Sequence, residues 1–178
     1  MSDDRSFTDL LRAQIRHGLT AAQQYLAAAV YFDAQRLPQL AAQCYARSGE
    51  NRGHALRMVQ YLLDRDQAVE IGGLDEVRSA FDSPRAAVAF LLDTERTRTD
   101  QITELAAAAR RSDDYLGEQF VQWFLKEQIE DTAGMTTLLT VLDRRGNLFD
   151  VEEFIRRELR STVAADTTAP KMAGTGRI

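Results

Sequence analysis

Polar side chains interrupt the apolar stripes of long helical patterns at one common depth. The second pattern carries Asn51 and His54 where leucines are expected, the third carries Glu95, and the fourth carries Gln128 and Asp131. A buried carboxylate without a partner is strongly destabilising, so repetition of this pattern over several helices is hard to explain as a defect. Oxygen and imidazole ligands suit iron, manganese or zinc. The spacing favours a metal site, with a hydrogen-bonded polar patch in the core as the alternative.

Five further residues lie close to this predicted polar layer. Gly18 interrupts the stripe of the first pattern, and Tyr25 follows two turns later on the same stripe. The Tyr25 hydroxyl could donate to a buried carboxylate, or the ring could simply belong to the core. Glu50, Glu127 and Glu130 are neighbours of the layer along their helices. They are either a second, inward-facing acidic cluster or an ordinary solvated face.

The elements that must position these residues are long helices. Apolar residues recur at steps of three and four over residues 7–34, 38–66, 84–111 and 115–145, and a shorter pattern runs from 148 to about 159. Ser6, Ser83 and Asn147 are placed as N-caps, and Gly146 as the residue that ends the fourth helix. The long connection 67–82 joins two antiparallel hairpins. The pattern predicts an all-α four-helix bundle with a long crossover and a short fifth helix.

Composition bounds the class of protein. The chain has 178 residues, 44% hydrophobic and 28% charged, which is typical of one globular domain. We expect a bundle domain over residues 1–160 and a mobile tail over 161–178. The net charge of −5 gives no electrostatic footprint for nucleic acid. No apolar run could span a bilayer, and the polar start Met1–Arg5 does not resemble a signal peptide, so we expect a cytoplasmic protein with no membrane partner. Cys44, the single cysteine, is expected in the core.

The chain resembles the bacterial non-haem ferritins over about residues 7–159, and is most similar to actinobacterial ferritins. Order, spacing and loop lengths all agree. The resemblance implies a self-assembling homo-oligomeric cage, a 24-mer, that oxidises Fe(II) and stores Fe(III) mineral. The segments that carry it are Leu19–Tyr25, Tyr31–Asp33, Leu37–Leu40, Gly53–Ala55, Leu62–Arg65, Phe81–Pro84 and, most specifically, Gln119–Glu130.

The resemblance also implies a di-iron ferroxidase centre in each bundle. In the family this centre uses a glutamate on the first helix, Glu-x-x-His on the second, a glutamate on the third and Gln-x-x-Glu on the fourth. By position His54, Glu95 and Gln128 are kept, and Asp131 stands where the last glutamate is expected. Tyr25 matches the family's conserved tyrosine. The accessory acids of a third iron site match Glu50, Glu127 and Glu130.

Two carboxylates of the implied centre are missing. Gly18 stands for the glutamate of the first helix, and Asn51 for the glutamate of Glu-x-x-His. We expect one weak metal site at the four remaining ligands instead of a di-iron pair, and a void at Gly18 that water fills. Arg52 stands where bacterioferritins carry their haem-ligating methionine, so haem is not expected.

The predicted function is therefore a cage subunit that stores iron and oxidises it slowly or not at all. The alternative is a non-catalytic structural subunit without iron storage of its own, which co-assembles with an active ferritin. An oxygen-activating carboxylate enzyme of the same superfamily is a remote third reading. It would need two Glu-x-x-His motifs, and neither is complete in this chain.

Overall fold

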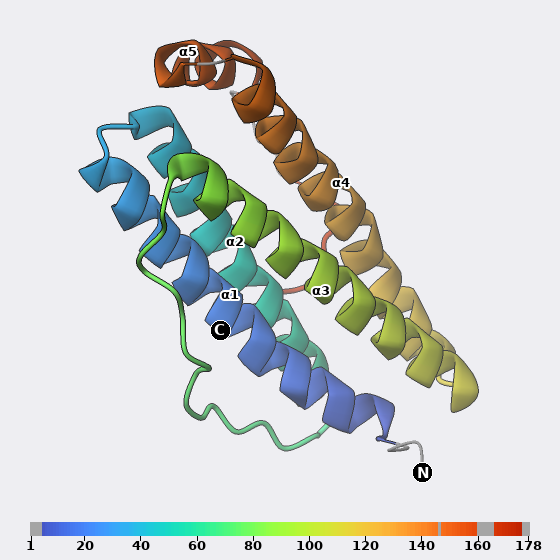
Figure 1. Cartoon of the computed structure of the whole chain (residues 1–178). Coiled ribbons are helices and arrows are strands. Elements are labelled where there is room, and N and C mark those ends of the chain that lie inside the picture. Colours follow the sequence, from blue (N-terminus) through green and yellow to red (C-terminus); the bar gives the residue numbers. More distant parts are fainter. Residues whose placement is uncertain (1–4, 146, 160–165, 176–178) are drawn as a thin grey trace.

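Four long helices and one short helix make up the fold. The computed structural model describes residues 5–145, 147–159 and 166–175. The four long helices lie side by side, and the short helix crosses one end of the bundle (Figure 1). The predicted all-α bundle with a long crossover and a fifth helix is confirmed. The helices are α1 (Phe7–Ala34), α2 (Pro38–Leu63), α3 (Pro84–Arg111), α4 (Tyr115–Arg145) and α5 (Leu148–Glu158).

The helix starts follow the predicted capping residues. The side chains of Ser6, Ser83 and Asn147 each accept a hydrogen bond from the backbone N–H three residues later. Such bonds satisfy donors that a helix start leaves unpaired. Helix α2 ends at Leu63, earlier than predicted, and the chain leaves it through a turn in which Asp66 has a φ of 54°. The predicted cap at residue 146 falls outside the described residues.

The connection between α2 and α3 runs back along α1 and contains no helix (Figure 1). Arg12 Nε donates to the Ala68 carbonyl at 3.0 Å. Further along, Gln24 makes two bonds of 2.7 Å to the backbone of Arg78, one to its carbonyl and one from its N–H. These bonds hold the crossover against α1.

The apolar core is divided into two clusters by a polar layer. One cluster lies towards α5 and includes Phe32, Leu40 and Leu91. The other lies towards the opposite end and includes Leu11 and Ile102. Most of the buried polar side chains come between them along the helices. They are Gln24, Asn51, His54, Glu95, Arg98, Gln128 and Asp131, whereas buried Gln14 lies beside Ile15 within the second cluster.

Residues 166–175 lie against α2 and α4. Trp123 Nε1 on α4 donates to Asp166 Oδ2 at 2.8 Å, and the Ala173 N–H donates to the Leu56 carbonyl on α2 at 3.1 Å. Mobility of the tail stays a prediction, because residues 160–165 and 176–178 are outside the described part of the chain. None of the described helices combines the length and apolar character needed to cross a membrane.

Candidate metal centre

Glu95 on α3 is the centre of the polar layer, and its side chain is fully buried. Tyr25 on α1 donates its hydroxyl to Glu95 Oε1 at 2.6 Å, and Gln128 on α4 donates Nε2 to Oε2 at 2.7 Å. Burial, and then the Glu95 carboxylate, raise the pKa of Tyr25 well above its usual value, so the phenol stays a proton donor. Three helices thus bring together three residues that the sequence had singled out.

Arg98 places a guanidinium directly beside the Glu95 carboxylate. It is one helical turn further along α3, and its Nη1 is 3.1 Å from Glu95 Oε2. The side chains of Arg98 and Glu95 are only 6% and 0% exposed, so this is a buried ion pair. Sequence reasoning missed Arg98, although the Glu-x-x-Arg spacing places both side chains on one face of a helix.

Asp131 also faces a guanidinium instead of a vacant ligand position. Arg47 on α2 forms an ion pair with Asp131 Oδ1 on α4. The same Arg47 Nη1 lies 3.6 Å from Glu50 Oε2, whose side chain is 47% exposed. Arg47 was also missed from the sequence, since nothing in the α2 pattern alone shows that it reaches α4. Both acids of the layer are therefore charge-paired within the chain.

The two positions that lack a carboxylate are packed differently from what the sequence suggested. A Cβ atom at Gly18 would lie 3.2 Å from Ala55 Cβ on α2. Ala55 thus lies directly beside Gly18, because α1 and α2 approach closely at this point, and the water-filled void stays a prediction. Asn51 donates Nδ2 to the Arg47 carbonyl at 2.9 Å, and its buried Oδ1 has no hydrogen-bond partner in the structure.

His54 lies in an aromatic setting beside the layer. Its ring centroid is 5.3 Å from that of Trp123 and 5.8 Å from that of Phe124, both in edge-to-face contact. Burial is the main cause that lowers the pKa of His54 to about 3, and the positive charges of Arg98 and Arg57 lower it further. The imidazole is therefore neutral, which is the metal-binding form, but the cations around it oppose a further positive charge.

Glu50 and Glu130 act electrostatically on Glu127. Burial raises the pKa of Glu127, and the carboxylates of Glu130, Asp166 and Glu50 raise it further. Asp166 comes from the C-terminal segment and was not foreseen in this cluster. The acidic surface next to the layer is thus assembled from α2, α4 and the tail.

Within the residues that the structure describes, no three His, Cys, Asp or Glu side chains are placed so that they could hold a metal ion together. The ligand roles of the sequence-predicted residues stay predictions. Guanidinium, phenol and amide donors hold the two buried carboxylates of the layer in fixed positions.

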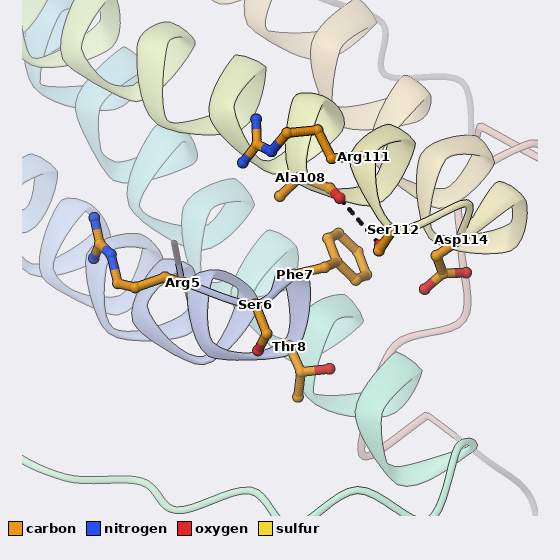
Figure 2. Close-up of a pocket in the computed structure, with 8 residues that line it drawn as sticks. All are labelled: Arg5, Ser6, Phe7, Thr8, Ala108, Arg111, Ser112 and Asp114. Carbon is orange, nitrogen blue, oxygen red and sulfur yellow. Dashed lines mark hydrogen bonds between the residues drawn. The ribbon is translucent and has the colours of Figure 1, made fainter. Parts of the chain in front are cut away.

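A separate pocket of about 680 Å³ lies between the start of α1 and the end of α3. Figure 2 shows Phe7 beside Ser112, which donates its hydroxyl to the Ala108 carbonyl, with Arg111 on the same α3 end. None of the candidate ligands lines this pocket. It is therefore not part of the polar layer.

An antiparallel four-helix bundle with a long crossover, and with carboxylate, amide and imidazole groups meeting at mid-height, defines a ferritin-like protein. A family model described as "Ferritin-like domain" matches residues 8–145. The chain belongs to this family.

Named relatives agree with this assignment. The chain is 55% identical over 172 residues to "Ferritin BfrB" of Mycolicibacterium smegmatis, covering 96% of this chain and 94% of that protein. It is 28% identical over 143 residues to "Bacterial non-heme ferritin" of Staphylococcus aureus, covering 80% and 86%. Among solved structures, an open pore ferritin from Archaeoglobus fulgidus superposes with a TM-score of 0.79 at 29% identity, covering 85% of this chain and 96% of that one.

Proposed function

We propose that this protein is an iron-storage subunit of a ferritin cage whose own ferroxidase centre is largely inactive. The observation that carries the proposal is the lack of free carboxylate ligands in the polar layer. Gly18 offers no ligand, and the Asn51 side chain is neutral. The two acids that remain buried, Glu95 and Asp131, are both bound by arginine. Fast oxidation of a bound Fe(II) pair needs anionic ligands on both ions, and this layer has no carboxylate free for that role.

Storage does not need this centre. Glu50, Glu127 and Glu130 form an acidic surface that Asp166 extends, and carboxylates are suitable ligands for iron as cargo. Iron, as Fe(II) on entry and Fe(III) in the mineral, is thus the proposed substrate and cargo, and haem has no proposed role.

Self-assembly is supported by apolar side chains that the single chain leaves uncovered. Val30 on α1 is 54% exposed, Ile71 in the crossover 63%, Tyr115 at the start of α4 74%, and Phe149 on α5 78%. Exposed apolar groups at several separate places are typical of subunits with more than one interface. We propose a closed homo-oligomer, a 24-mer by analogy with the family, in the cytoplasm. Mixing with an active ferritin subunit is compatible with the same surfaces.

The test is iron oxidation and loading in the purified assembly. Fe(II) is added under air, oxidation is followed by the absorbance of Fe(III) oxo species, and protein-bound iron is then determined. We expect slow oxidation, no initial burst, and a mineral core after prolonged loading. A burst of about two Fe(II) ions per subunit would contradict the inactive centre. Absence of any core would favour the structural, co-assembling subunit instead.

Electron microscopy of the same sample tests the cage. Hollow particles of uniform diameter are expected. A monomer or dimer at micromolar concentration would refute self-assembly into a closed shell.

A further inference from the structure

Two arginines face the inside of the polar layer from different helices. Arg98 on α3 is 6% exposed, and Arg47 on α2 is 21% exposed. A buried guanidinium is strongly disfavoured without an anion beside it. Each of the two arginines has one of the layer's buried acids as its partner, Glu95 or Asp131. The layer therefore contains two buried negative charges and two positive charges that match them.

We propose that Arg98 and Arg47 act as built-in substitutes for metal cations, so that the layer is closed to divalent metals of any kind. The inference rests on the proposed function and deepens it. It explains the inactive ferroxidase centre by two arginines that occupy the cation positions, as well as by the missing carboxylate ligands. The two causes differ in consequence. Missing ligands alone leave a weak site, whereas occupancy by arginine leaves no site until an arginine is removed.

Charge balance is the physical reason. A divalent ion that entered between Glu95 and Asp131 would add two positive charges to a layer that is already neutral. It would either repel two guanidinium groups at close range in a medium of low dielectric constant or force one of them out.

The hydrogen bonds of Glu95 support the same conclusion. Oε1 accepts from Tyr25, and Oε2 accepts from Gln128 and from Arg98. A metal bound to either oxygen would displace one of these donors. Arg98 Nε already has no hydrogen-bond partner, so displacement would leave the guanidinium still less satisfied.

Cobalt(II) tests the proposal without any iron chemistry. Bound Co²⁺ is detected by its visible absorption, and by quenching of Trp123, the only tryptophan, whose ring contacts His54. In the wild-type assembly we expect no Co²⁺ signal that depends on Glu95. In Arg98→Met we expect a Co²⁺ site at least ~10-fold tighter than any in wild type, because one like charge is removed at short range. Adding Glu95→Gln to that variant should abolish the new site.

The matched control is Arg96→Met. Arg96 is on the same helix, but its side chain is 61% exposed and pairs with Asp93 at the surface. It should leave Co²⁺ binding at wild-type level. Should Arg98→Met fail to fold, Arg47→Met opens the Asp131 side of the layer, and Asp131→Asn added to it should abolish the new site.

Two results would overturn the proposal. One is a Co²⁺ site in the wild-type protein that Glu95→Gln or Asp131→Asn removes. The other is a pair of folded arginine variants that bind no more Co²⁺ than wild type. Neither result depends on the iron-loading assay, so storage could still hold if the occupancy idea failed.

Discussion

The buried Arg98–Glu95 pair allows a quantitative test by a double-mutant cycle of Arg98→Met, Glu95→Gln and the double variant. Removing Arg98 leaves a fully buried carboxylate with only the neutral donors Tyr25 and Gln128. Removing the charge of Glu95 leaves a guanidinium that is 6% exposed without its anion. Each single change breaks a buried ion pair, which destabilises a protein by ~3–5 kcal/mol.

The double variant should be much less destabilised than the sum of the two single variants. Methionine keeps an unbranched apolar stem like that of arginine and carries no charge, and replacing both charges of a buried pair by neutral groups is often close to neutral. Because the two single losses together come to ~6–10 kcal/mol and the double variant loses far less, we expect an interaction energy above ~3 kcal/mol between the two sites.

The assay is reversible unfolding at fixed protein concentration, since assembly makes apparent stability depend on concentration. Circular dichroism reports the helices as the assembly unfolds. Losses that add to within ~0.5 kcal/mol would refute the reasoning, because independent sites add and interacting sites do not.

Three further outcomes follow from the same contacts. Gly18→Ala should change the free energy of unfolding by less than ~1 kcal/mol in thermal unfolding, because the close approach of the added methyl to Ala55 Cβ, 3.2 Å, opposes the ~1 kcal/mol that alanine gains over glycine in a helix; a loss above ~2 kcal/mol would show that α1 and α2 cannot adjust at this point. Asn51→Leu should be neutral or stabilising by up to ~1 kcal/mol, since it removes a buried acceptor that has no partner; a loss above ~2 kcal/mol would contradict this. Asp166→Asn should change the fluorescence of Trp123, whose Nε1 donates to that carboxylate at 2.8 Å. In wild type the pKa of Asp166 is lowered from 3.8 to about 2 by its hydrogen bonds, chiefly from Thr168 and Trp123. The contribution of these bonds is complete above pH 3.8 and is lost as the pH falls through about 2, so a fluorescence change centred well above pH 4 would be evidence against this contact.

Local patterns were sufficient for the fold. Apolar periodicity, Pro38 and Pro84 at helix starts, and the serine and asparagine caps specified helices whose ends differ little from those observed. These signals act within a few residues of one another, so they can be read without knowing the partner of each face. The depth of the polar layer also followed from the sequence, because helix length fixes height along a bundle axis.

What fills the layer was decided by tertiary structure. The sequence identified Glu95 and Asp131 as acids without a visible partner, and a metal was the natural expectation. Whether an acid meets a metal or an arginine depends on which side chain reaches it across the bundle, and Arg47 reaches Asp131 from another helix. The close packing of Ala55 from α2 against Gly18 likewise could not be foreseen. Both outcomes come from contacts between residues far apart in the chain, and spacing along one helix carries no information about them.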